Sequence, residues 1–399
     1  MYDLITPTQQ TLLAMLADSL KGKKQPTAPD DPVSLWREAH LQGVLLLAFS
    51  RVETKTYSPD LQNEMHATVK RLLSSNMRLS IAHASLSSLL ESANIPHAII
   101  KGYACSIWYP APELRQLGDV DFFVAKEDVA RAGALLEANG YAPDTKSHKL
   151  HEIYFKDGIR FEMHFDLHGI PEGETGDACR SALAGLIQNA RLRQTPFGEM
   201  RLPSIFDHGL VLLLHIAHHL TNSGIGLRQL CDWAVFVETV TDAEFERLYG
   251  TVLRELGLWR FACCLTEVCV TALGIEKKEW MTESDPETAR LLLADVISGG
   301  NLGQKNVQRS QQAYLITSGS SSRTKRARMT RLLLDMIYQK WPASKKYKVL
   351  VPFGWAFYGG RYLLRVAGGK RPRVQVKSVL HGAEDRIDLY DRLRLYERR

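Results

Sequence analysis

Signatures of several protein classes are missing from this 399-residue chain. The six cysteines form no Cys-x-x-Cys pair, which argues against a zinc ribbon or a disulfide framework and favours a reducing compartment. The N-terminal residues MYDLITPTQQ contain neither the basic nor the apolar segment of a signal peptide. No apolar run is long enough to cross a bilayer, so we expect a cytoplasmic protein.

Motifs of several enzyme classes are also absent. No G-x-x-x-x-G-K-[ST] sequence occurs, which excludes a P-loop, and no G-x-S-x-G sequence marks a hydrolase nucleophile. Gly224 and Gly226 are followed by Gln229 where the third glycine of a dinucleotide-binding fingerprint is required. The chain is therefore not expected to use a P-loop, a serine nucleophile or a dinucleotide.

Four histidines, at positions 208, 215, 218 and 219, lie close together in one predicted helix. His215 and His219 have the i, i+4 spacing of two zinc ligands on a helix face. However, Ile216 replaces the glutamate of the H-E-x-x-H motif, and no further ligand follows at metal spacing. No zinc is expected, and His218 is predicted to face a cleft beside Arg228 and Asp232, which are spaced as an ion pair.

Composition and charge describe a globular body with a basic C-terminal region. Apolar residues make up 45% of the chain and charged residues 24%, as in ordinary globular proteins. Residues 323–399 contain 20 Lys and Arg against 6 Asp and Glu, a net charge of +14. Since the whole chain carries +6, the other 322 residues carry −8. Either the basic region binds an anionic partner, or its charge serves only solubility.

The segment from Lys345 to Arg373 mixes basic residues with aromatic ones. It could attach to an anionic membrane surface, which would place the protein at the inner face of the membrane. It could equally pack on the body with its charges solvated. Nucleic acid is not an expected partner, because no known nucleic-acid-binding module pattern occurs.

The pattern of elements predicts an α+β fold that is mostly helical, with a small mixed sheet between helical regions. Apolar periodicity and the helix-start signal Asp31-Pro32 indicate helices over residues 7–95. The predicted regions are an N-terminal helical region (1–95), an α/β core (96–203), a helical domain (204–298), a linker (299–323) and the basic region (324–399).

Two strand patterns in the predicted core place charged residues on a sheet. Residues 98–100 read as one strand, and residues 119–124 as another that alternates with period two, so that Asp119 and Asp121 share a face. The turn Asp157-Gly158 joins two further strands into a hairpin. On its second strand Glu162, His164 and Asp166 share a face.

Paired carboxylates on one strand face repel each other unless a cation lies between them. Mg²⁺ is typically held by a few carboxylates together with substrate phosphates, and two such ions can serve an in-line phosphoryl displacement. Asp119 and Asp121 are embedded in an apolar strand, where unpartnered charges are unusual, and Glu162 offers a third carboxylate on a later strand. These residues are a candidate magnesium site.

The order of these motifs resembles the nucleotidyltransferase superfamily typified by DNA polymerase beta, in which a glycine turn precedes an acidic pair and a distant third acid. The similarity is closer to the bacterial uncharacterised nucleotidyltransferases, which often accompany polysaccharide or secondary-metabolite clusters, and it covers roughly residues 30–300. The segments that carry it are His40–Val44, Ile99–Gly102, Tyr109–Arg115, Gly118–Asp121, Phe161–Phe165, His215-x-x-His218 and Leu227–Asp232.

The resemblance implies transfer of a nucleoside monophosphate from an NTP, which would be bound with two Mg²⁺ ions, to an unidentified acceptor. By this resemblance Asp119, Asp121 and Glu162 are catalytic and hold the metal. The nucleotide-binding residues would be Lys101, Gly102, Arg115 and Gly118. Residues on the acceptor side would be His164, Asp166, His218, Arg228 and Asp232.

The chain departs from the superfamily pattern at the glycine turn. Tyr103 follows Gly102 where the superfamily usually has Gly or Ser, so the turn offers no serine hydroxyl to the triphosphate. Two other functions stay open. One is a non-catalytic scaffold of a polysaccharide or secondary-metabolite assembly, although an intact acidic trio argues against it. The other is a toxin-type transferase that modifies tRNA or protein, which the basic region would favour.

Overall fold

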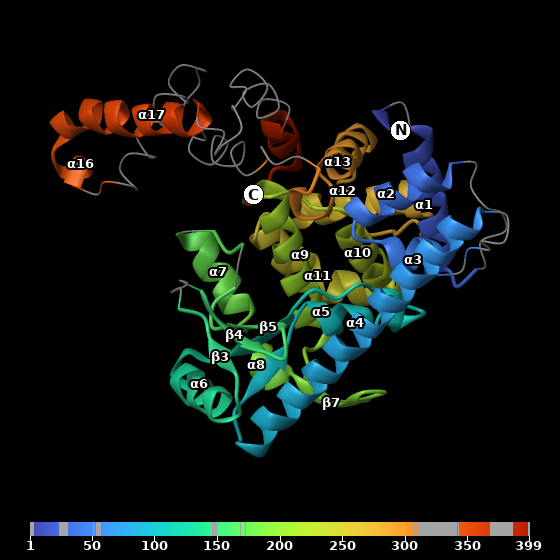
Figure 1. Cartoon of the computed structure of the whole chain (residues 1–399), viewed down its shortest axis with the longest axis horizontal. Helices are drawn as coiled ribbons and strands as arrows, with labels where there is room; N and C mark the ends of the chain where they lie inside the picture. The colour runs from blue at the N-terminus through green and yellow to red at the C-terminus, as the bar shows by residue number, and fades with distance from the viewer. Residues whose placement is uncertain are drawn as a thin grey trace. The chain divides into compact units, whose positions relative to one another are not determined.

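The computed structural model describes residues 4–23, 31–50, 52, 57–145, 150–167, 169–171, 173–305, 309, 341, 343–367 and 386–397. Two compact units contain them. The first comprises Met1–Leu220, Gly224–Lys305 and Leu393–Arg399, and the second comprises Thr221–Ser223 and Asn306–Arg392. A five-stranded mixed sheet and many helices make up the first unit (Figure 1), which confirms the predicted α+β, mostly helical class.

The N-terminal helices begin where the sequence provides caps. Helix α1 (Pro7–Leu20) starts with a capping box made by Thr6 and Gln9, and Asp31 accepts a hydrogen bond from the Ser34 amide at the start of α2 (Pro32–Leu41). Helix α3 (Leu45–Phe49) is short, and α4 (Pro59–Ser92) extends over 34 residues. Helical structure over most of residues 7–95 is thus confirmed.

The order of strands in the sheet is β1-β2-β5-β4-β3. Strand β2 (Val120–Val124) pairs antiparallel with β1 (His97–Ile99) and parallel with β5 (Ile159–His164). The hairpin of β4 (His151–Lys156) and β5 turns at Asp157 and Gly158, whose φ angles of 52° and 71° suit a type I′ turn. Strand β3 (Ala142–Pro143) forms the other edge. The first strand lies one residue earlier than predicted, at 97–99 instead of 98–100.

Alternation along the strands separates an apolar core face from a polar face. Val120, Phe122 and Val124 are fully buried in one cluster with Leu90 of α4 and Leu136 of α6 (Val129–Ala138). The intervening residues of β2 and the even-numbered residues of β5 lie on the opposite face. The charged residues predicted to form the site on β2 and β5 therefore lie on the sheet face away from α4 and α6.

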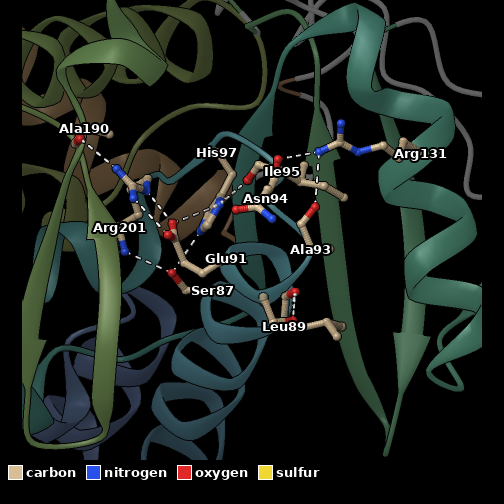
Figure 2. A network of polar contacts seen from close by, with 11 residues as sticks. Ser87, Leu89, Glu91, Ala93, Asn94, Ile95, His97, Arg131, Ala190 and Arg201 are labelled. Atoms are coloured by element: carbon tan, nitrogen blue, oxygen red, sulfur yellow. Dashed lines mark hydrogen bonds and ion pairs between the residues drawn. The ribbon is translucent and has the colours of Figure 1, made fainter.

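A polar network anchors the C-terminal end of α4 beside the sheet (Figure 2). The Arg201 guanidinium binds the Glu91 carboxylate, and the Arg201 amide donates to Ser87 Oγ at 2.9 Å. Ser87 Oγ in turn contacts His97 Nε2 at 2.9 Å, and His97 Nδ1 contacts the Ile95 carbonyl at 3.0 Å. Because these bonds join α4 to β1 and to β7, the long helix is fixed in place along the domain (Figure 1).

The remaining elements of the first unit are helical apart from one hairpin. Helix α5 (Gly102–Ser106) follows β1, and the elements after β5 are α7 (Glu174–Ala182), α8 (Leu186–Asn189), β6 (Arg191–Thr195), β7 (Gly198–Leu202), α9 (Ile205–Thr221), α10 (Leu227–Thr239), α11 (Asp242–Glu255), α12 (Trp259–Leu273) and α13 (Pro286–Gly299). Helix α1 packs on α10 and α12, whereas α4 packs on β1 and β7. Gln42 at the end of α2 joins that helix to α13 and α10, because its side chain donates to the Ile297 carbonyl and accepts from the Leu227 amide.

In the second unit, the described elements include α16 (Ala343–Lys346) and α17 (Val351–Ala367). No described helix has the length and apolar character needed to span a membrane. Of the predicted linker 299–323, only residues 299–305 and 309 lie within the described residues. The domain boundaries proposed from the sequence remain predictions.

Candidate active site

Three carboxylates lie within electrostatic range of one another on the polar face of the sheet. Asp119 immediately precedes β2, and the parallel register of β2 and β5 sets Asp121 opposite Glu162. Repulsion from Asp121, together with burial and the charge of Glu162, raises the pKa of Asp119 to about 7. The neighbouring negative charges therefore keep Asp119 partly protonated near neutral pH.

Asp121 is the most strongly stabilised of the three anions. Lys101 Nζ lies 2.7 Å from Asp121 Oδ1, His164 Nε2 lies 2.8 Å from the same oxygen, and the two nitrogens are 3.2 Å apart. Burial opposes ionisation, but Lys101 and then His164 hold the pKa of Asp121 well below its usual range. The positive charge beside Asp121 is therefore the ammonium group of Lys101.

Glu162 lies between a basic and an aromatic neighbour. Arg160 Nη2 is 2.5 Å from Glu162 Oε1, and His164 Nε2 is 3.4 Å from Glu162 Oε2. Glu162 and His164 are both buried, and both lie on the strand face predicted from their even spacing. The arrangement leaves the Glu162 carboxylate beside Asp121 without a guanidinium between them.

The glycine turn after β1 is conformationally unusual. Lys101 has φ +53° and ψ −133°, a combination that is costly for a residue with a side chain and is typical of functional sites. A Cβ on Gly102 would lie 3.0 Å from His83 Nε2 and 3.5 Å from the Asp119 carbonyl oxygen. A side chain here would require His83 to shift by a few tenths of an ångström, so glycine favours the close approach of this turn to α4.

Arg115, predicted to bind the nucleotide, is part of a buried ion pair. Its Nε and Nη2 donate to the two oxygens of Asp232 at 2.9 and 2.7 Å, and the Tyr109 hydroxyl donates to Oδ1 at 2.7 Å. Arg115 and Asp232 are 6% and 4% exposed. The expected pairing of Asp232 with Arg228 is thus replaced by pairing with Arg115.

The structure separates the other predicted residues. Asp166 lies beyond the end of β5, accepts from the Leu167 amide and pairs with Arg180 at 3.5 Å, so it does not share the strand face as predicted. Gly118 is exposed, and a Cβ there would meet no atom within 4 Å. His218 lies on α9, where burial first and then the Lys101 charge lower its pKa.

His151 belongs to this region but was not predicted. The β4–β5 register pairs it with His164, and ligand atoms of His151, Glu162 and His164 lie within 4.8 Å of one another. The signal was present in the sequence: a two-residue turn at 157–158 fixes which residues face each other across the hairpin. Extending that register would have identified His151.

The chemistry of the donor set fits Mg²⁺. Hard divalent cations bind carboxylate oxygens, and Asp119, Asp121 and Glu162 supply them on adjacent chain segments. The raised pKa of Asp119 reflects a mutual repulsion that a bound cation would relieve. Among the described residues, the group whose ligand atoms all lie within 4.8 Å of one another is His151, Glu162 and His164, so the metal-binding role of Asp119 and Asp121 remains a prediction.

Comparison with known proteins identifies the family of the chain. The family model described as "Uncharacterised nucleotidyltransferase" matches residues 28–274, more than half of the chain. No curated protein matches the chain. Among solved structures, the chain is similar to the crystal structure of an antigenic nucleotidyltransferase-like protein from Paracoccidioides brasiliensis. Their identity is 17% and the TM-score 0.32, over 50% of this chain and 94% of that one.

Proposed function

Because the chain belongs to the uncharacterised nucleotidyltransferase family, we propose that it transfers a nucleoside monophosphate from an NTP to an acceptor. The acceptor oxygen forms a bond to the α-phosphorus, and the bond from that phosphorus to the bridging oxygen breaks. The acceptor proton passes to the protein, and pyrophosphate leaves with the bonding electron pair. The acceptor is a sugar, another small molecule or a protein side chain.

The acidic cluster carries this proposal. Asp119, Asp121 and Glu162 would hold Mg²⁺, which neutralises charge on the phosphates when it is bound. Glu162 is also placed to accept the acceptor proton, and His164 beside it would orient the carboxylate. Lys101 lies in reach of both Asp121 and a bound phosphate, so its ammonium would move from the carboxylate toward the substrate. Catalysis would rest on positioning and electrostatic stabilisation.

The experiment is calorimetric titration of the full chain with ATP, GTP, CTP and UTP, with and without Mg²⁺. We expect Mg²⁺-dependent binding of one nucleotide to the wild type and none to the double variant Asp119→Asn/Asp121→Asn. Asp177→Asn is the matched control, since Asp177 is an exposed carboxylate on α7. A folded wild type that binds no nucleotide would contradict the proposal and favour the scaffold function.

A further inference from the structure

A small cavity lies behind Lys101, between α5 and the helices α9 and α10. Its volume is about 30 Å³, room for about two water-sized atoms. One wall is apolar (Val211, Leu212), and the polar lining groups come from Lys101, Cys105, Arg115, His208, His215, Arg228, Gln229 and Asp232. An enclosed space with this many polar walls is suited to a polar ligand.

Three nitrogen atoms of the lining residues are buried without a hydrogen-bond partner among the residues that the structure describes: Arg228 Nε, His208 Nε2 and His215 Nδ1. Buried polar atoms are nearly always satisfied, and each exception calls for an explanation. Because all three belong to residues around one cavity, a ligand with acceptor oxygens would explain them together.

The balance of charge determines the sign of that ligand. Asp232 neutralises Arg115, and Asp121 neutralises Lys101. Arg228 donates only to the uncharged Gln116 carbonyl, at 3.2 Å, and burial and the neighbouring Arg115 lower its pKa. His208 and His215 are kept neutral, because burial lowers the pKa of His208 to about 4 and that of His215 well below its usual range. Among the residues that the structure describes, no carboxylate forms a direct ion pair with the Arg228 guanidinium, although Asp232 and Asp119 lie within electrostatic range, and an anion is the complementary ligand.

We propose that this cavity receives terminal phosphate oxygens of the NTP, so that Arg228, His208 and His215 bind the part that leaves as pyrophosphate. The inference rests on the proposed function. Lys101 links the two sites, since it lines the cavity and contacts Asp121, and Arg228 also lies in electrostatic range of Asp119. The assignment moves Arg228 from the acceptor side to the donor side. It also supplies phosphate contacts that Tyr103 cannot provide in place of a serine.

The test measures binding of inorganic pyrophosphate without metal, by calorimetry and by thermal shift, together with the KM for the NTP. Arg228→Met keeps much of the side-chain volume but removes the charge, and Arg254→Met is the matched control on exposed α11. We expect Arg228→Met to weaken pyrophosphate binding by roughly 10- to 100-fold, as the loss of a charge-assisted hydrogen bond does. The control should bind pyrophosphate as the wild type does.

The melting temperature distinguishes pyrophosphate binding by Arg228 from a purely structural role of that residue. Pyrophosphate affinity, compared with NTP binding, distinguishes failure of this inference from failure of the proposed function. Ligand-free Arg228→Met should melt no lower than the wild type, because the buried charge it removes makes no direct ion pair within the described residues, while pyrophosphate should no longer raise its melting temperature. Unchanged pyrophosphate affinity in Arg228→Met would overturn the inference, even if NTP binding and turnover persist. Pyrophosphate binding that depends on Arg228 in a protein that binds no NTP would instead support an anion site and refute the transferase.

Discussion

At the scale of single residues, Asp119 shows most directly what crowding carboxylates does. Its pKa of about 7 means that the folded protein retains a proton that the unfolded chain releases near pH 4. Folding stability is therefore lost as the pH rises from about 4 to 7, because ionisation adds a third negative charge to the cluster. A cation binding there would reverse this loss.

We predict that Asp119→Asn stabilises the metal-free protein, although it abolishes metal-dependent nucleotide binding. The gain should be small at pH 5 and larger at pH 8, with an upper bound on the order of 4 kcal/mol. Urea unfolding with EDTA at both pH values measures it. Equal stability of variant and wild type at pH 8 would show that Asp119 is not crowded as described.

Gly102 and Gly118 provide a matched pair of substitutions on either side of the site. Gly102→Ala should destabilise the fold by about 1–3 kcal/mol, because the new methyl group would lie 3.0 Å from Nε2 of the buried His83 ring. Gly118→Ala should stay within about 0.5 kcal/mol of the wild type, since its methyl group enters open space. Denaturation midpoints of the two variants check this, and similar midpoints would contradict it.

At the scale of elements, the ion pair of Arg115 and Asp232 joins α10 to the loop that leads into β2. We predict that Asp232→Asn costs about 3–5 kcal/mol of folding stability, because it leaves the Arg115 guanidinium buried without a counter-ion. Glu287→Gln, which breaks an exposed pair on α13, should cost less than about 1 kcal/mol. Thermal unfolding of both variants gives the comparison, and equal losses would refute a special role for the buried pair.

The features that were predicted correctly are those whose signals lie in neighbouring residues of the sequence. Period two placed Val120, Phe122 and Val124 in the core and Asp121 on the other face, and Asp157-Gly158 located the hairpin. The pairing of Arg115 with Asp232 was not predicted, because 117 positions separate them and i, i+4 spacing favoured Arg228 instead. Asp166 was wrongly placed on a strand face, since nothing local showed that β5 ends at His164.

Glu162, the third carboxylate, shows the same division between local signals and contacts of residues that are distant in the sequence. Alternation along β5 correctly put Glu162 and His164 on one face, but only the parallel pairing of β5 with β2 brings them to Asp121. Helix α5 and the β6–β7 hairpin were not predicted at all, because they are short and their packing, more than their propensity, defines them. The roles of these residues remain predictions.

At the scale of the whole molecule, charge is divided between an acidic body and a basic C-terminal region. Helix α17 carries Phe353 and Phe357 at 65% and 61% exposure, one turn apart, and Lys346 and Lys348 lie just before it. Exposed aromatic groups beside basic ones are typical of attachment to anionic membrane surfaces. Membrane attachment therefore remains a prediction for this segment, beside packing on the body.

We predict that the full chain sediments with phosphatidylserine-containing vesicles and not with neutral phosphatidylcholine vesicles. Phe353→Ser/Phe357→Ser should reduce the bound fraction several-fold without changing nucleotide binding, since both residues lie outside the acidic site. High salt should also weaken attachment. Binding of RNA, with strong salt dependence and no vesicle binding, would favour the toxin-type transferase.

The parallel pairing of β2 with β5 also sets the order in which the site forms during folding. The β4–β5 hairpin closes locally, but β5 reaches β2 only after α6 and the hairpin have been placed, since a parallel pair needs a long connection. We therefore expect the carboxylates to come together late, when most of the surrounding surface is already buried. A bound metal ion should accordingly slow unfolding while leaving the rate of folding nearly unchanged.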